Sequence, residues 1–433
     1  MKVEIITTGE EVLSGQITDT NATWISQLLG RHGLDMTWRS TVGDRMEDLV
    51  YVFKERSRFA DVIIVNGGLG PTSDDMSAAA AAEAVGEPLV ANEEWMAHLE
   101  KRFAAMNREL LPDNRKQAML PASAEMLHNP IGTACGFVVA LERAHLYFTP
   151  GVPSEMKKMM TEVILPHMEA KFGFNYASRL KRLHSFGIAE ARVGATLSEI
   201  PLPDGITLGY RAHLPTLEIK VMGLGKDEQQ LDADVAHVAQ QIRDKMGENL
   251  AFEDDHSLAS RVQELMIDKG YTLALAESCT GGMAASWLIE VPGSSAYFDR
   301  GFVTYTNASK TEMLGVDAGL IEEYGAVSME VARAMALGAR QKAGTTHAVA
   351  VSGIAGPGGG SEEKPVGTVC FALACAEGVW TQMVYAPRWG RKAIRTVSAA
   401  VMLDMLRRQL TDQPIFGNYD LIKRKETRIE EAE

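Results

Sequence analysis

The stretch DVIIVNGGLGPTSDD, residues 61–75, carries the pattern that decides the fold. It begins with a continuous aliphatic run, which is typical of a strand buried on both faces of a parallel sheet. Gly67 and Gly68 come soon after and allow the chain to turn sharply at the carboxyl end of that strand. An alanine-rich helix follows the turn. A strand, a glycine-rich turn and a helix in this order indicate a doubly wound α/β sheet.

The same alternation continues on both sides of this stretch. Residues 3–7 are a strand candidate, and the helix after them has an apolar face and a C-terminal signal at Gly33. Asp44 is placed to cap a further helix. The run LYFTPG at residues 146–151 repeats the strand-to-glycine pattern. We therefore expect a first α/β domain over residues 1–168.

The remainder of the chain divides into three parts. Prolines and short alternating runs predict a small α+β middle domain over residues 169–252, with a helix over residues 227–246. Strand and helix patterns return over residues 253–412 and predict a second doubly wound α/β domain. Residues 413–433 form a charged tail, which we expect to be a solvated helix end.

The composition limits the class of protein. The 433 residues are 46% hydrophobic and carry a formal net charge of -14, as in an acidic globular protein with sizeable cores. A dedicated nucleic-acid binder usually carries a basic patch, and the sequence suggests none. The four cysteines lack metal-type spacing, and no apolar run approaches the length of a membrane span. We expect a cytoplasmic protein that binds neither nucleic acid nor a membrane.

The loop after the first quoted strand has two interpretations. A tight turn with a capping threonine fits the spacing as well as a loop whose free N–H groups bind phosphate. The residues that would serve the second role are Gly67, Gly68, Gly70 and Thr72. Asp74 and Asp75 could hold a divalent cation through their carboxylates, or they could stabilise a helix dipole.

Four motifs add a resemblance to a known family. They are TTGEEVLSGQITDTNA, VGD, NGGLGPTSDD and FTPGVPSEM, in this order. They resemble the amino-terminal domain of CinA proteins, which is similar to the molybdopterin-binding fold of MoaB and MogA. The resemblance implies metal-dependent hydrolysis of ADP-ribose to AMP and ribose phosphate. It assigns the phosphates to Gly67, Gly68, Gly70 and Thr72 and the metal or water to Asp74 and Asp75, with Glu10, Glu11, Asp19 and Asn21 as secondary candidates.

A second glycine-rich turn follows the strand candidate at residues 272–277. Ser278 heads this turn, where it could be a nucleophile or the N-cap of the next helix. Cys279 is a rival nucleophile, although an unpaired cysteine more often packs as a small apolar side chain. Lys310 could be a surface charge, or it could lose its proton when desolvated beside Ser278 and act as a base. Because no histidine lies in a comparable loop, a Ser–Lys pair is favoured over a Ser-His-Asp triad.

Two further segments could contact a substrate. A third glycine-rich loop, at residues 352–360, begins with Ser352. The segment RWGRKAIR offers Arg388, Arg391 and Arg395, which suit bidentate phosphate recognition but are also compatible with a solvated helix start.

The motifs AESCTGG, FVTYTNASK, GAVS, SGIAGPGGG and KPVGTV resemble the PncC family of nicotinamide-nucleotide amidases, which forms the carboxy-terminal domain of CinA. The resemblance implies hydrolysis of nicotinamide mononucleotide (NMN) to nicotinate mononucleotide and ammonia. It makes Ser278 the nucleophile and Lys310 the base, while Tyr305 would orient Lys310 or protonate the leaving amine. The residues it assigns to substrate binding are Thr280, Gly281, Gly282, Ser352, Gly353 and Arg391.

The sequence therefore predicts a bifunctional enzyme of pyridine-nucleotide recycling. The deamidase would need no cofactor, whereas the ADP-ribose pyrophosphatase would need a divalent metal ion. An alternative is that one domain is a non-catalytic nucleotide sensor. Ser73, which stands where many relatives have a lysine, makes the amino-terminal domain the candidate for that role. We expect small nucleotides as ligands and a homodimer as the assembly.

Overall fold

The computed structural model describes the chain from residue 1 to residue 431, apart from residues 35, 175 and 388. The chain divides into two compact units, residues 1–179 with 224–231, and residues 180–223 with 232–433. No helix in the described residues is both long and apolar enough to span a bilayer. The Arg388 candidate lies outside the described residues.

Unit 1 is built on a six-stranded sheet of order β2-β1-β3-β8-β7-β6. The first four of these strands are parallel, and β7 and β6 are antiparallel additions at one edge. The strands are β1 (Val3–Thr8), β2 (Met36–Val42), β3 (Val62–Asn66), β6 (Glu125–Leu127), β7 (Gly136–Leu141) and β8 (Ala144–Thr149), with a separate β4 (Leu89–Ala91) and β5 (Met119–Pro121) pair.

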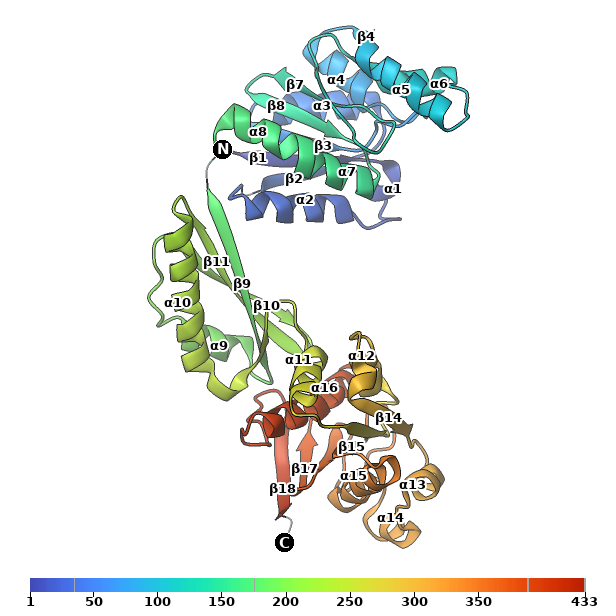
Figure 1. Cartoon of the computed structure of the whole chain (residues 1–433), viewed down its shortest axis with the longest axis vertical. Coiled ribbons are helices and arrows are strands. Elements are labelled where there is room, and N and C mark those ends of the chain that lie inside the picture. The colour runs from blue at the N-terminus through green and yellow to red at the C-terminus, as the bar shows by residue number, and fades with distance from the viewer. Residues whose placement is uncertain (35, 175, 388, 432–433) are drawn as a thin grey trace. The chain divides into compact units, whose positions relative to one another are not determined.

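Helices cover both faces of this sheet (Figure 1). Neighbouring strand residues alternate between the faces: Ile5 packs with α2, α7 and α8, whereas Ile6 packs with α3, α4 and α5. The helices are α1 (Glu10–Leu13), α2 (Thr20–Arg31), α3 (Met46–Arg56), α4 (Ser77–Val85), α5 (Glu93–Ala105), α6 (Pro112–Arg115), α7 (Pro153–Met159) and α8 (Leu165–Phe172). A two-sided core of this kind confirms the predicted doubly wound fold.

The middle of the chain forms a four-stranded sheet of order β10-β11-β9-β12. Its strands are β9 (Ala177–Phe186), β10 (Ile206–His213), β11 (Thr216–Gly225) and β12 (Leu250–Glu253), accompanied by α9 (Glu190–Leu197) and α10 (Glu228–Met246). The alternating strand and the long helix predicted for this region are therefore present.

The carboxy-terminal sheet has the order β14-β13-β15-β16-β17-β18, in which β14, β13 and β15 are parallel. Leu273 and Leu275 face α11, α12 and α16, and Ala274 and Ala276 face α15, so both faces are again covered. The strands are β13 (Leu273–Glu277), β14 (Phe298–Val303), β15 (His347–Gly353), β16 (Thr368–Ala374), β17 (Gly378–Tyr385) and β18 (Lys423–Glu431). The helices are α11 (Leu258–Asp268), α12 (Met283–Ile289), α13 (Asn307–Leu314), α14 (Ala318–Tyr324), α15 (Met329–Ala343) and α16 (Arg391–Leu410).

The predicted helical end of the tail is wrong. Residues 423–431 form β18, which pairs antiparallel with β17 along the sheet edge. An edge strand can be charged because its side chains stay in water, and charge there discourages pairing with other chains. Opposite charges on α15 also hold it, since Arg428 lies 2.6 Å from Glu330 and Arg333 lies 2.7 Å from Glu430.

Two predicted helix caps are also wrong. The N-cap of α3 is Arg45, and the Asp44 carboxylate instead accepts a hydrogen bond from the Glu10 backbone N at 3.1 Å. Likewise, α4 begins at Ser77. Thr72 and Asp75 therefore close a turn ahead of that helix, in which the Asp75 carboxylate accepts from the Thr72 backbone N at 2.9 Å.

Candidate active site and nucleotide pocket

Ser278 lies in a tight turn at the carboxyl end of β13. Gly281 and Gly282 have φ angles of 62° and 88°, a conformation that favours glycine, and they take the chain from the turn into α12. The N-cap of α12 is Gly282, so Ser278 does not cap that helix. Its backbone N instead donates to Val351 O at 3.1 Å, which fixes the turn against β15.

Lys310 lies next to Ser278. Its side chain on α13 is only 1% exposed, and its Nζ lies 3.2 Å from Ser278 Oγ and 2.9 Å from Thr304 O. Burial of the ammonium lowers the pKa of Lys310, because the charged form loses its hydration. The structure thus brings together the two residues that the sequence paired, and it places the amine within reach of the serine proton.

Two residues whose roles the sequence did not reveal stabilise the turn that begins at Ser278. Buried Glu277 accepts hydrogen bonds from the backbone N of Ala284 and Ala285 at 3.2 and 2.8 Å, which anchors the start of α12. Arg395 on α16 donates to Cys279 O at 3.1 Å and to Thr280 O at 2.7 Å. Glu277 thus holds the start of α12, and Arg395 holds two carbonyl groups of the turn, through hydrogen bonds to charged side chains.

Cys279 is poorly suited to be the nucleophile. It is 5% exposed, and burial raises the pKa of its thiol to about 12. Nucleophilic cysteines act as thiolates, which need an electropositive and accessible setting. The thiol therefore packs as an apolar side chain, and Ser278 is the stronger candidate.

Tyr305 and Arg391, two further residues that the resemblance assigns to the site, lie next to each other. Tyr305 is 61% exposed and its hydroxyl lies 3.4 Å from Arg391 Nη2, whereas the hydrogen bonds described for Lys310 go to Ser278 and Thr304. Arg391 also donates to Gly356 O at 2.7 Å, in the third glycine-rich loop. The hydrogen bond described for the Tyr305 hydroxyl therefore joins it to Arg391 rather than to Lys310.

Three hydroxyls around the turn differ in their hydrogen bonding. Ser352 lies at the end of β15 beside Gly353, and its Oγ donates to Ala326 O at 2.5 Å. Its proton is therefore already used within the protein. Thr280 and Thr304 are fully buried, and among the described residues neither hydroxyl has a hydrogen-bond partner. Unpaired buried hydroxyls beside a nucleophile are available to a ligand or water.

A pocket lies at the carboxyl edge of the sheet in unit 1. The loop of Gly67, Gly68 and Gly70 faces Thr8 and Gly9 after β1, with Pro150 and Gly151 after β8 completing one wall. A Cβ added at Gly67 would lie 2.8 Å from Thr8 O, so the backbones approach here as only glycine allows. This is the edge where open α/β sheets bind ligands.

Carboxylates dominate this pocket. Glu11, Asp44, Asp74, Asp75 and Glu155 line it. Burial raises the pKa of Asp44, and the nearby negative charges of Glu11 and Asp74 raise it further. Oxygen donors suit a hard divalent cation, and Thr8, 6% exposed, adds a hydroxyl without a partner in the described residues. The donor set therefore fits the metal ion that the resemblance implies.

Among the four secondary candidates, only Glu11 lines this pocket. Asp19 caps α2 through Ala22 N at 2.8 Å, and Asn21 donates to Asn66 Oδ1 and Gly151 O at 3.0 and 2.7 Å. Glu10 is paired with Arg45 at 3.7 Å. The contacts of Asp19, Asn21 and Glu10 are therefore those of residues that shape the loops.

Lys116 brings a positive charge to the same loop. Its Nζ donates to Thr72 O at 2.6 Å, next to Ser73. No local pattern predicts this contact, because 44 positions separate the two residues. The loop thus has a cation beside it even though position 73 is a serine.

Comparison with known proteins supplies the family. Residues 4–170 match the probable molybdopterin binding domain, residues 180–250 the damage-inducible protein CinA KH domain, and residues 255–410 the CinA C-terminal domain. Fold and site thus define a mixed α/β protein that joins a molybdopterin-binding-type domain to a CinA-type domain with a buried Ser–Lys pair.

Full-length relatives make the assignment specific. A CinA-like protein of Shewanella denitrificans is 50% identical over 424 residues, which cover 98% of this chain and 99% of that protein. A Shewanella oneidensis protein named nicotinamide-nucleotide amidohydrolase PncC is 49% identical over the same shares of the two chains. The chain belongs to the family of CinA-like proteins.

Solved structures match over single domains. The competence/damage inducible protein CihA of Agrobacterium tumefaciens is 45% identical, covers 36% of this chain and 93% of its own, and has a TM-score of 0.35. A CinA protein of Thermoplasma acidophilum is 32% identical, covers 39% of this chain and 96% of its own, and has a TM-score of 0.36.

Proposed function

We propose that the carboxy-terminal domain hydrolyses the carboxamide of NMN to give nicotinate mononucleotide and ammonia. The observation that carries the proposal is the 3.2 Å approach of buried Lys310 Nζ to Ser278 Oγ. A buried lysine without its proton is a base, and an adjacent hydroxyl is the group it activates. The name of the Shewanella oneidensis relative supports NMN as the substrate.

In the first step the neutral Lys310 amine takes the Ser278 proton as Oγ bonds to the carboxamide carbon. The carbonyl oxygen becomes an oxyanion, which donors at the turn would stabilise; a pre-placed donor of this kind contributes about 3–4 kcal/mol. The buried hydroxyls of Thr280 and Thr304 are candidate donors, since neither has a partner in the described residues. The hydrogen bonds from Arg395 to Cys279 O and Thr280 O keep the turn in place while the negative charge forms on the substrate oxygen.

In the second step the oxyanion collapses and the C–N bond breaks. Lys310 returns its proton to the leaving nitrogen, so ammonia departs and Ser278 carries a nicotinoyl ester. Lys310 then takes a proton from water, whose oxygen attacks the ester carbon, and the serine leaves with that proton. The sum is one water consumed and one ammonia released, with the enzyme regenerated.

The substrate phosphate would bind at Arg391. Its guanidinium connects the third glycine-rich loop, through Gly356 O, with the exposed hydroxyl of Tyr305. A planar guanidinium at this position can bind two phosphate oxygens at once. Tyr305 then has the role of orienting the arginine, and the leaving group is protonated by Lys310.

The direct test is product analysis with NMN and no added metal. We expect nicotinate mononucleotide and ammonia in equal amounts. NMN that binds and raises the melting temperature without turnover would instead support the sensor alternative, since a ligand specific for the folded state must stabilise it. Absence of both binding and turnover would reject the substrate.

For unit 1 we propose metal-dependent hydrolysis of the ADP-ribose pyrophosphate. The supporting observations are the acidic pocket beside the glycine-rich loop and the contact of Lys116 Nζ with Thr72 O in that loop. Asp44 and Asp74 would hold a divalent cation, which would screen the phosphates from the carboxylates. Asp75 would brace the loop through Thr72, so its role shifts from metal ligand to loop support.

This second activity is tested with ADP-ribose and Mn²⁺ or Mg²⁺. We expect AMP to form only with the ion, and Asp44→Asn and Asp74→Asn to abolish its formation. The exposed Asp113→Asn is the matched control and should behave as wild type. Stabilisation by ADP-ribose without AMP would make unit 1 a sensor.

A further inference from the structure

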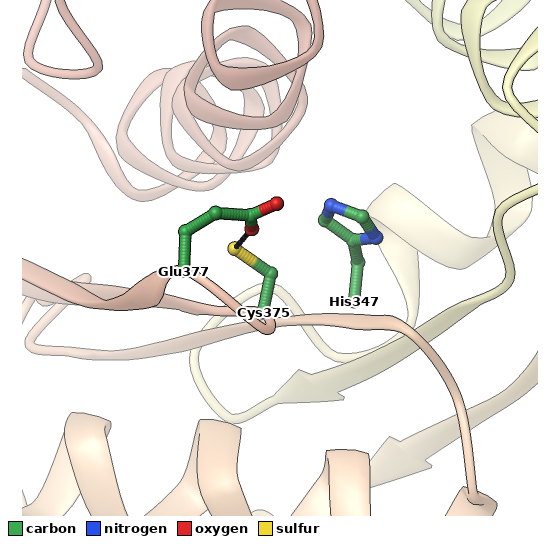
Figure 2. Close-up of side chains that lie close together, drawn as sticks. All are labelled: His347, Cys375 and Glu377. Carbon is green, nitrogen blue, oxygen red and sulfur yellow. Dashed lines mark hydrogen bonds between the residues drawn. The ribbon is translucent and has the colours of Figure 1, made fainter. Parts of the chain in front are cut away.

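Three potential metal ligands meet at the opposite end of the carboxy-terminal sheet from Ser278. His347 is the first residue of β15, and Cys375 and Glu377 lie in the turn between β16 and β17 (Figure 2). Strand β15 is parallel to β13, with His347 opposite Leu273 and Val351 opposite Glu277. Because Ser278 follows the last residue of β13, it lies at the carboxyl ends of these strands. The potential metal ligands lie at the opposite end, where β15 begins at His347.

The ligand atoms are already close enough to share one ion. One atom each from His347, Cys375 and Glu377 lies within 4.8 Å of the others. Figure 2 shows the thiol of Cys375 directed at the carboxylate of Glu377, with the imidazole ring beside them, and Sγ lies 2.6 Å from Oε2. His347 and Cys375 are 2% and 3% exposed, whereas Glu377 is exposed, so an ion can enter from solvent at Glu377.

Both ring nitrogens of His347 have hydrogen-bond neighbours. The Thr346 hydroxyl lies 2.9 Å from Thr272 O and 2.9 Å from His347 Nδ1. In the tautomer whose Nδ1 donates its hydrogen to this hydroxyl, the lone pair of His347 is on Nε2, where a metal ion can bind. This second-sphere hydrogen bond is the kind that orients metal-bound histidines.

A fourth group completes the arrangement. Nε2 of His347 lies 3.1 Å from Gln409 Oε1, at the end of α16. With a hydrogen on Nε2 the two atoms form a hydrogen bond, and a bound cation would take the place of that hydrogen. The cluster therefore offers nitrogen, sulfur and oxygen donors from four positions, unlike the all-oxygen pocket of unit 1.

We propose that His347 Nε2, Cys375 Sγ and the Glu377 carboxylate bind a zinc-class divalent cation, with Gln409 or water in the fourth position. Mixed imidazole, thiolate and carboxylate ligation is typical of Zn²⁺ and of Co²⁺ as its substitute. Cys375 gives up its proton on binding. The ion ties the start of β15 to the β16–β17 turn and the end of α16, so its role is structural.

The test is a Co²⁺ titration of the full-length protein after removal of bound metals. Thiolate ligation gives a near-ultraviolet charge-transfer band, which carboxylates alone cannot give. We expect the band at one equivalent per chain, its displacement by Zn²⁺, and a higher melting temperature with Zn²⁺. The Asp44→Asn, Asp74→Asn double variant should keep the band, which separates this site from the pocket of unit 1.

Variants identify the ligands. Cys375→Ser should lose the band, and exposed Glu377→Gln should raise the apparent Kd for Co²⁺ by roughly tenfold or more, since 1.4 kcal/mol is tenfold. Buried Cys370→Ser is the matched control and should keep the band. Circular dichroism checks that each variant is folded, and NMN turnover should stay at the wild-type rate. No band in the wild type, or a band that survives Cys375→Ser in folded protein, would overturn the proposal.

Discussion

Two glycine-rich loops occupy equivalent places in this chain, each after a buried strand at the carboxyl edge of an α/β sheet. The loop after β13 holds a serine beside a buried lysine, whereas the loop after β3 faces a group of carboxylates. Because both loops have the same kind of backbone turn, the turn alone does not decide which reaction each site can catalyse. The charged side chains that neighbouring helices and strands place beside each loop decide it.

Both sites keep a charge arrangement that works against folding. Lys310 is buried without an acidic partner among its described hydrogen bonds, and the unit 1 carboxylates repel one another. Arrangements of this kind are common at functional sites, because a base must lose its proton and a cation site must attract an ion. The comparison therefore predicts a metal-independent reaction at one loop and a metal-dependent one at the other.

The largest expected effect is at Lys310. Lys310→Met and Lys310→Arg should each lower kcat/KM for NMN by roughly 10²–10⁴-fold, since methionine has no base and arginine keeps its proton. In the wild type, kcat/KM should rise with pH as Lys310 loses its proton, with a midpoint below the ordinary lysine pKa because burial lowers it. The exposed Lys342→Met is the control. A flat pH profile, or arginine as active as lysine, would remove Lys310 as the base.

A smaller effect is expected at Lys116, whose Nζ meets Thr72 O. Lys116→Ala should weaken ADP-ribose binding by roughly ten- to a hundredfold, because one charge-assisted contact contributes about 1.5–3 kcal/mol. The exposed Lys101→Ala should bind normally. Isothermal titration in the presence of Mn²⁺ measures both. Equal affinities would show that the lysine supports only the loop.

The smallest effect is on stability. Lys310→Met should raise the melting temperature of the carboxy-terminal domain by roughly 2–4 °C, because it removes a buried ammonium at similar volume. A lowered folded-state pKa costs most at pH values below it, and this cost fades as pH rises towards the unfolded value. The gain should therefore shrink in alkaline buffer, as scanning calorimetry can show. A destabilised variant would mean that Lys310 contributes to the fold.

Local patterns in the sequence were enough for the central buried strands and for the two loops. Apolar strands such as Val62–Asn66 and Leu273–Glu277 are buried on both faces, so their identity depended on no distant partner. Gly33, with a φ of 71°, follows the C-cap of α2 as predicted. The pairing of Ser278 with Lys310 came from the motifs and is consistent with the geometry.

Features that depend on distant contacts escaped prediction. The strand β18 consists mostly of charged residues and becomes a strand only because β17 offers an open edge. Asp44 meets Glu10, Lys116 meets Thr72, and Arg395 meets Cys279, and each pair is far apart in sequence. The resemblance implies that Tyr305 orients Lys310 or protonates the leaving amine, but its hydroxyl lies 3.4 Å from Arg391 Nη2.

The most direct test of the central claim is ammonia release from NMN, without added metal, by the wild type, Ser278→Ala and Cys279→Ala. The Ser–Lys account predicts that Ser278→Ala loses turnover by at least about 10³-fold while still binding NMN, and that Cys279→Ala stays near the wild-type rate. Full activity in Ser278→Ala with loss in Cys279→Ala would contradict it and make the thiol the nucleophile.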